Sequence, residues 1–483
     1  MSWATEIVGE IALGDERLNE RLVTLIETFV KQPAAAIPEA CGSWAATEAA
    51  YRFFDNGAVR PDEISRAMAA ATAQRCEGMP LVLAVQDTTS LDYTTHTDTV
   101  GLGALEHPSH RGVFVHTTLA VNPDGGVPVG IVSQQVWTRD PATRGKSAAR
   151  KEVPVEAKES ARWLVGLQET EARLGPSVRV LTVADREADV YELFALAAEL
   201  HGDWLIRARH DRTLDGDEHH LLVAVAHAPV CAQSTIELPR TDEREARRAT
   251  LAVRRAQVVL VPPRRAVGVI AAWWAAHPDV AHLAPLTLGP VRVGVVLVSE
   301  VGTPAGAKPV RWLLLTSLPV ETPEQALACV GFYRLRWLVE RYHFVLKSGC
   351  RVERLQLETF ERLHRALVVY SEVAWRLLWL TYAARAHPTA PCTVVFDELT
   401  WRLLWVVDCP TTTLPLTPPD LRTVVRKIAM LGGFLGRKGD GEPGVKTLWR
   451  GLRRLNDMVA TYRILHEHPD LLPGHLASQL SCV

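Results

Sequence analysis

Apolar residues recur at helical spacing at the start of the chain. From Ala12 to Lys31, leucine, isoleucine and phenylalanine follow one another at three- and four-residue steps, with charged residues between them. This is the pattern of an amphipathic helix. Two more helical stretches, 43–54 and 62–75, follow a break rich in proline and alanine. The pattern predicts a small all-helical domain over residues 1–75.

The pattern then changes to short apolar runs that are typical of buried strands. Leu81–Val85 and Val178–Val183 are two of these runs, and Val113–Val121 and Val127–Gln135 flank a turn-forming segment. We expect an antiparallel three-stranded start to a sheet. Because helical segments alternate with the later strands, we predict an α/β domain over residues 76–375.

A different pattern interrupts this domain between about residues 211 and 309. Short β-like runs are broken there by proline, glycine and clusters of arginine, which indicates a β-rich insertion. The segment Thr322-Pro323-Glu324-Gln325 then marks a helix start, with a threonine cap and a proline in the first turn. Helical patterns continue to the end and predict a helical C-terminal domain over residues 376–483.

The helical pattern after residue 322 carries an unusual set of polar side chains. Tyr333, Arg336, Glu340 and Lys347 have the spacing Y-x2-R-x3-E-x6-K. At about 100° per residue they fall within a sector of about 60° on one helix. Arg336 and Glu340 also fit an ordinary pairing of helix neighbours, so the spacing alone leaves the choice open.

Two aspartates far upstream add weight to a functional interpretation. Asp87 and Asp185 each come just after an apolar run that predicts a strand. A single aspartate in that place is most often a turn or N-cap residue. Together with Glu340, however, they form a set of three carboxylates that can hold two divalent ions for phosphoryl transfer. Oxygen ligands without thiolates favour Mg²⁺ or Mn²⁺.

Composition and charge exclude only a few classes of protein. The 483 residues are 47% hydrophobic and 22% charged with a formal net charge of -2, so any DNA binding must be local. The eight cysteines show no zinc-ligand spacing, and no apolar run approaches the length of a membrane span. No signal peptide is evident at the N-terminus. We therefore expect a cytoplasmic protein with no membrane contact.

Three segments give the chain a family resemblance. Gln86–Leu91, Asp185–Asp189 and the Tyr333–Lys347 helix resemble the signature segments of the IS4 family of transposases, which includes relatives of the Tn5 transposase. The likeness extends to both ends of the chain, through Ala12–Arg17 and Leu431–Phe434. It therefore covers essentially the whole sequence.

The resemblance implies a fold and a catalytic triad. The expected fold is α/β, an RNase H-like catalytic core with a β-rich insertion, flanked by all-helical N- and C-terminal domains. The expected metal ligands and catalytic residues are Asp87, Asp185 and Glu340, with two Mg²⁺ or Mn²⁺ ions. The resemblance also implies cut-and-paste transposition by end nicking, hairpin formation and resolution, and strand transfer.

It further implies a separate group of DNA-binding residues. Tyr333, Arg336 and Lys347 would grip the transposon end near a flipped base, and Trp312 lies where the family has a tryptophan that stacks on this base. An aromatic residue that caps the core is the alternative interpretation of Trp312.

Partners and rival functions follow from the same resemblance. The expected partners are double-stranded DNA, as inverted-repeat ends and target, and a second copy of the chain in a nucleoid-associated bacterial complex. In the N-terminal domain Arg52, Arg60 and Arg66 are equal candidates for reading the transposon end. The alternatives are an RNase H-like nuclease without strand transfer and a catalytically inactive DNA-binding relative.

Overall fold

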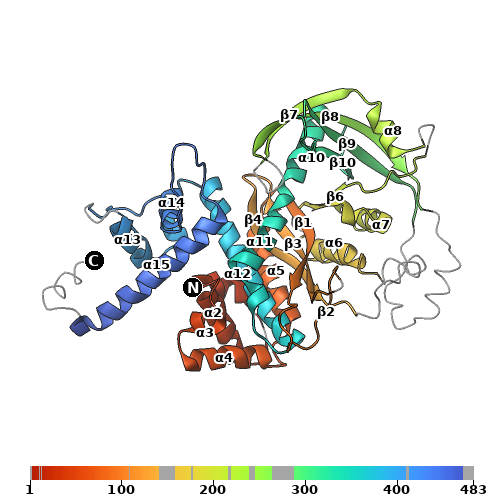
Figure 1. Ribbon diagram of the computed structural model, residues 1–483. Helices are drawn as coiled ribbons and strands as arrows, with labels where there is room; N and C mark the ends of the chain where they lie inside the picture. Colours follow the sequence, from red (N-terminus) through yellow and green to blue (C-terminus); the bar gives the residue numbers. More distant parts are fainter. Residues whose placement is uncertain are drawn as a thin grey trace.

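A long mixed sheet forms the middle of the molecule, with helices against it and at one end (Figure 1). The N-terminal helices pack beside the core of the sheet, and the C-terminal helices project from it on the side opposite the strands β7–β9. The computed structural model describes residues 3–9, 11, 13–107, 109–140, 158–175, 178–215, 219–238, 245–263, 288–408 and 413–471.

The N-terminal segment is helical, as its periodicity predicts. Asp15 caps the second helix by accepting a hydrogen bond from the backbone N of Arg17 at 3.0 Å, so this helix begins at Glu16. Its apolar stripe, which includes Leu22 and Phe29, is buried. The helices are α1 (Trp3–Val8), α2 (Glu16–Lys31), α3 (Ile37–Cys41), α4 (Trp44–Asp55) and α5 (Pro61–Cys76).

The core of the sheet has parallel and antiparallel parts. Strand β1 pairs in parallel with β5, which pairs in parallel with β6, whereas β3 and β4 continue antiparallel on the other side of β1. The predicted antiparallel start of the sheet is confirmed. The strands are β1 (Val82–Asp92), β2 (Gly103–Ala104), β3 (Arg111–Asn122), β4 (Val127–Trp137), β5 (Val180–Ala184) and β6 (Asp203–Arg207).

The β-rich segment extends this same sheet. In the described residues the strand order is β2-β3-β1-β5-β6-β10-β9-β8-β7, with β4 beside β3. The two short runs expected at 251–253 and 258–261 are parts of one long strand, because β8 pairs with β9 without interruption from Thr250 to Leu260. The strands are β7 (Val230–Leu238), β8 (Arg247–Leu260), β9 (Val291–Val301) and β10 (Arg311–Thr316).

Helices cover both faces of the core strands. Alternate residues of β5 divide between the faces: Leu181 and Val183 belong to the core that includes α11 and α12, whereas Ala184 packs with α6 and α7. This follows from the two-residue period of a strand. The helices are α6 (Ala161–Leu174), α7 (Tyr191–Glu199), α8 (Leu221–Ala226), α10 (Pro323–Leu335), α11 (Trp337–Phe344) and α12 (Phe360–Ala386).

The C-terminal helices α13 (Glu398–Asp408), α14 (Leu421–Leu431) and α15 (Val445–Glu467) pack on one another and on α12. Two glycines let α14 and α15 approach closely. A Cβ atom at Gly451 would lie 1.7 Å from the carbonyl oxygen of Ile428, and one at Gly432 would lie 1.8 Å from that of Thr447. Together these elements give the mixed α/β fold with helical ends that was expected. None of the helices described here combines the length and apolar character that a membrane crossing requires.

Candidate active site

Asp87 and Asp185 lie at matching positions relative to two neighbouring parallel strands, β1 and β5. The ladder between β1 and β5 ends with the pair Val85 and Val183, and each aspartate lies two residues beyond its member of that pair. Strand β1 continues against β3 as far as Asp92. The expectation that Asp87 follows the end of a strand is therefore wrong. The apolar run stops at Val85 because pairing with β5 stops there, while β3 keeps the strand extended.

Asp185 directly follows β5, as expected. Its Oδ1 atom accepts a hydrogen bond from the backbone N of Glu187 at 2.8 Å and caps the short 3₁₀ helix Arg186–Ala188. The residue thus makes the contact that an ordinary N-cap aspartate makes. That contact also fixes the direction of the carboxylate, beside Asp87.

The single helix expected over residues 333–347 is divided into three parts. Arg336 separates α10 from α11, and a π-helical turn covers Val345–Gly349. The backbone of Arg336 keeps helical angles, φ -52° and ψ -34°, so the chain continues with only a local break. The π-helical turn changes the angular spacing, so Lys347 departs from the common face that regular α-helical spacing predicts.

Arg336 lies between two of the expected carboxylates. Its Nη1 atom is 3.8 Å from Oδ2 of Asp87, and its Nη2 atom pairs with Oε1 of Glu340, four residues further along the helix. The arginine side chain is only 14% exposed. The guanidinium expected to grip DNA is therefore a counter-ion for Asp87 and Glu340 in this structure.

The carboxylates influence one another electrostatically. Burial raises the pKa of the Asp87 carboxyl to about 7, and the charges of Asp185 and Glu340 act in the same direction. Arg336 and a hydrogen bond from the backbone N of Thr88, at 2.9 Å, oppose this shift. Asp87 thus lies in a partly desolvated place where negative charge converges, which is the environment of many functional carboxylates.

The donor set suits a hard divalent cation. Asp87, Asp185 and Glu340 offer only oxygen atoms, and their combined charge exceeds that of the one arginine between them. Across the part of the chain that the structure describes, no group of three or more His, Cys, Asp or Glu side chains is close enough to hold a metal ion as it stands. The residues fit such an ion in charge and chemistry, and would have to draw closer to bind it.

Lys347 lies at a separate place, near the far end of β1. Its Nζ atom is 3.8 Å from Oε1 of Glu353, and the same oxygen accepts a hydrogen bond from the backbone N of Asp92 at 3.0 Å. The structure therefore brings Arg336 to the carboxylates Asp87 and Glu340, but gives Lys347 a different acidic partner.

Tyr333 and Trp312 form an aromatic pair close to Arg336. Their ring centroids are 5.3 Å apart in an edge-to-face arrangement, and the guanidinium carbon of Arg336 is 5.8 Å from the centre of the tyrosine ring. Tyr333 is only 5% exposed, and burial raises the pKa of its hydroxyl. Trp312 is half-buried on β10 and packs against the main core. The hydroxyl of Tyr333 therefore stays protonated and able to donate a hydrogen bond.

Arg162 belongs to the site although no sequence motif includes it. Its Nε atom donates to Oγ1 of Thr88 at 2.9 Å, and its Nη2 atom donates to Oε2 of Glu187 at 2.9 Å. Thr88 follows Asp87, and Glu187 donates the backbone hydrogen bond to Asp185. Arg162 thus connects the neighbours of both aspartates. An arginine near the start of an amphipathic helix has no distinctive spacing, so only its contacts reveal it.

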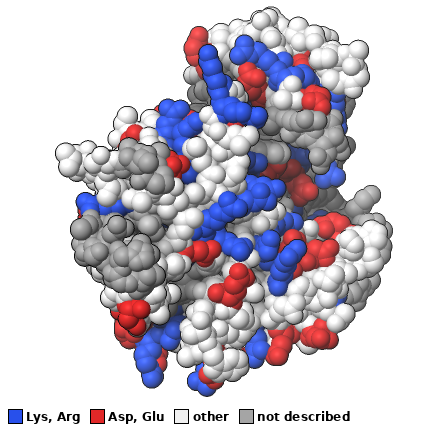
Figure 2. Space-filling view, turned by 60° about the vertical axis from the view of Figure 1, so that its left-hand side comes forward, with Lys and Arg blue, Asp and Glu red and all other residues white. Residues whose placement is uncertain are grey.

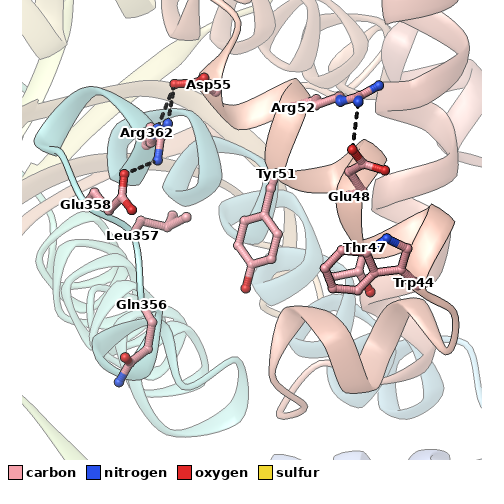
Figure 3. A pocket seen from close by; sticks show the side chains of 10 residues that line it. All are labelled: Trp44, Thr47, Glu48, Tyr51, Arg52, Asp55, Gln356, Leu357, Glu358 and Arg362. Atoms are coloured by element: carbon pink, nitrogen blue, oxygen red, sulfur yellow. Dashed lines mark hydrogen bonds and ion pairs between the residues drawn. The ribbon is translucent and has the colours of Figure 1, made fainter.

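A hollow of about 430 Å³ lies between the N-terminal helices and the chain leading into α12 (Figure 3). Arg52 pairs with Glu48 at 2.6 Å, and Arg362 pairs with Asp55 at 2.7 Å and with Glu358 at 2.6 Å. The indole of Trp44 beside these pairs is 82% exposed. The charges in this hollow are therefore largely neutralised.

The other two N-terminal candidates are paired as well. Arg60 and Arg66 share one carboxylate, that of Glu63. All three arginines considered for reading DNA thus have glutamate partners close to them in the chain. Their contacts do not single out any one of them.

Family models match almost the whole chain. Residues 1–59 match a transposase DNA-binding family, residues 110–371 a transposase DDE domain family, and residues 372–469 a Tn5 transposase dimerisation domain family. Asp185 and Glu340 fall within the DDE match, whereas Asp87 precedes it. The three matches follow one another in the order DNA-binding, DDE and dimerisation domains. The chain therefore belongs to the Tn5-like, IS4-family DDE transposases, metal-dependent enzymes that cut DNA and transfer its strands.

Proposed function

We propose that this chain is a cut-and-paste transposase whose chemistry depends on Asp87, Asp185 and Glu340. The observation that carries the proposal is their convergence: two aspartates at matching positions of parallel strands lie beside the helix that bears the glutamate. The DDE match supports it. Two Mg²⁺ or Mn²⁺ ions, when bound by these carboxylates, would activate the attacking oxygen and stabilise the leaving oxygen.

The proposed reaction has four displacements at phosphorus. Water nicks one strand at the transposon end, and the freed 3′-hydroxyl attacks the opposite strand to form a hairpin. A second water reopens the hairpin, and the 3′-hydroxyl then joins the end to target DNA. Each step is an in-line displacement that one site can perform in turn.

Residues around the carboxylates would position the DNA strand. Arg336 would exchange its carboxylate partners for a phosphate, because a guanidinium binds either group through the same pair of donors. Lys347 would contact a second phosphate, and the protonated hydroxyl of Tyr333 would donate to the strand. Arg162, through Thr88 and Glu187, would hold the two aspartates in register.

Trp312 would stack on an extruded base. Its contact with Tyr333, which would itself bind the strand, supports this role but also fits a role in packing the core. The substitution Trp312→Ala separates the two roles. Stacking on a base predicts a larger loss of hairpin formation than of first-strand nicking, whereas a packing role predicts equal losses of both.

Domain roles follow from the same proposal. Residues 1–75 would bind the transposon end, residues 76–375 would form the catalytic domain with its insertion at about 211–309, and residues 376–483 would hold two copies together in the synaptic complex. The DNA-binding and dimerisation matches support the first and last of these roles. We expect the complex to work on the bacterial nucleoid.

The decisive experiment uses paired linear ends and a supercoiled target in Mg²⁺. A transposase yields joined products, whereas a nuclease without strand transfer yields only cut ends and an inactive relative yields neither. The linear ends would carry the short inverted repeats that we expect to flank the reading frame. Asp185→Asn protein is the matched control, and joined products from it would remove Asp185 from the catalytic group.

A further inference from the structure

A basic pocket lies where the three matched segments of the chain meet. It measures about 310 Å³ and is lined by the N-terminal loop at Pro33 and Ala34, by the end of α11 with the π-helical turn, and by α15. We call it the α15 pocket. Its charged and aromatic lining residues are Arg351, Lys446, Arg450, Arg453, Phe344 and Trp449.

The cations of the α15 pocket have no acidic partner among the residues that the structure describes. Arg351, Lys446, Arg450 and Arg453 are all exposed, and none makes an ion pair with a carboxylate in the described residues. The lining residues include no Asp or Glu. This contrasts with the N-terminal hollow, where each arginine is paired. Four unpaired positive charges around one hollow create a local attraction for an anion, although the whole chain has a net charge of -2.

Two aromatic rings form part of the same wall. The ring centroids of Phe344 and Trp449 are 5.8 Å apart, and Phe344 is 37% exposed. Gly349 makes room for the indole, because a Cβ atom there would lie 3.1 Å from Cε3 of Trp449. An exposed aromatic ring beside cations suits the bases and phosphates of a nucleic-acid strand.

The pocket lies close to the proposed active site. Phe344 follows Glu340 by four residues on α11, so it lies one turn, about 6 Å, further along the same side of the helix. Helix α15, which forms another wall of the pocket, is attached to the N-terminal helices. Asn456 of α15 donates a hydrogen bond to the carbonyl oxygen of Lys31, the last residue of α2, at 2.8 Å. On the face drawn in Figure 2, Lys and Arg side chains gather in a band across the middle of the molecule.

From these observations we infer that the α15 pocket binds the backbone of the DNA strand next to the segment being cut. The inference rests on the proposed function, which identifies the strand as DNA that the enzyme cuts. It assigns a DNA-binding role to α15, a helix that lies within the match to a dimerisation domain. The contact is independent of sequence, since arginine and lysine at a phosphate read no base. Arg450 and Arg453 contribute most, because they lie three residues apart on one face of α15.

The test measures DNA binding without any chemistry. Full-length protein in EDTA is titrated against a labelled mixed-sequence duplex that carries a single-stranded 3′ extension, over a series of salt concentrations. The variant is Arg450→Gln/Arg453→Gln. The control, Arg402→Gln/Arg463→Gln, removes the same charge from the same domain at arginines that already pair with Glu398 and Asp397.

We expect the pocket variant to bind the probe at least about tenfold more weakly than the parent, and equally so for different sequences. The slope of log K against log salt should fall by about 0.7–0.9 for each phosphate that the variant no longer binds. The control should keep the affinity and slope of the parent. Arg450→Lys/Arg453→Lys should restore most of the binding, since the charge remains. Melting curves of all the proteins separate a binding defect from a folding defect.

Two results would overturn the inference. One is equal affinity and slope for the pocket variant and its control. The other is loss of self-association by the pocket variant with an unchanged salt slope, which would assign the pocket to a second copy of the chain. Neither depends on catalysis. A protein that binds the probe as expected but never joins ends would count against the proposed function alone.

Discussion

The active site and the α15 pocket lie one helical turn apart, but they differ in what balances their cations. Near the active site Arg336 pairs with Asp87 and Glu340, and Lys347 pairs with Glu353. In the α15 pocket the lining residues include no carboxylate to pair with the cations. Paired cations contribute little net attraction until a metal or a phosphate displaces their partners, whereas unpaired cations attract DNA from the start. Chemistry and strand binding should therefore be separable by mutation.

The largest expected effect is on chemistry. Glu340→Gln should lower strand cleavage by roughly 10³-fold or more, because a charged ligand is removed while the shape of the side chain is kept. DNA affinity in EDTA should change little, since Arg336 is still present to meet phosphate. Gel assays of nicking in Mg²⁺ and anisotropy in EDTA measure the two quantities. An equally large loss of cleavage and of DNA affinity would show that chemistry and strand binding do not depend on separate regions.

Removing the arginine between the carboxylates tests its role as a counter-ion. Arg336→Gln should destabilise the metal-free protein by about 1–3 kcal/mol, because Asp87 and Glu340 lose their shared partner. Added Mg²⁺ should then raise the melting temperature more than in the parent, since the ion no longer competes with a guanidinium. Thermal melts with and without Mg²⁺ measure this difference.

Arg341→Gln is the matched control for that experiment, because it removes a charge further along α11, from a side chain that contacts Phe344 and not the carboxylates. An equal response of Arg336→Gln and the parent to Mg²⁺ would show that Arg336 does not occupy the place of the ion.

The sequence revealed much of the first region and none of the second. The proposed triad and the aromatic residue near it could be named from the sequence because Asp87, Asp185 and Glu340 stand in motifs of the family that the chain resembles. The π-helical turn at Lys347 could not be predicted, since regular spacing assumes a uniform helix. The full length of β8 was not predicted either, because its arginines break the apolar pattern that marks a strand.

Contacts between distant segments were missed for a different reason. Arg162 acts on residues that are far from it in the chain, and no spacing predicts such a contact. The α15 pocket is made by residues from three segments that are widely separated in sequence, as Pro33, Arg351 and Arg450 illustrate. Its cations resemble any exposed arginines until the fold shows that no acidic residue lines the same pocket.

A carboxylate placed in the α15 pocket should make it resemble the active-site region. Ser348 is exposed on the wall of the pocket, three residues before Arg351. Ser348→Asp should lower DNA affinity several-fold and reduce the salt slope, because the new charge pairs with a neighbouring cation. Ser348→Asn, with nearly the same size as Asp and no charge, should bind as the parent does. Equal binding by the two variants would show that DNA does not reach this wall.

The smallest effect is expected from the opposite change, which frees a paired cation. Glu353→Gln should raise DNA affinity about two- to threefold, since an ion pair of this exposure is worth roughly 0.2–1 kcal/mol. The amide oxygen of glutamine can still accept from the backbone N of Asp92 and keep β1 in place. The gain should disappear in Glu353→Gln/Lys347→Gln, because the cation that was freed is then absent. If the double variant keeps the gain, the removal of negative charge acts on DNA directly, and the pairing of Lys347 with Glu353 does not limit DNA binding.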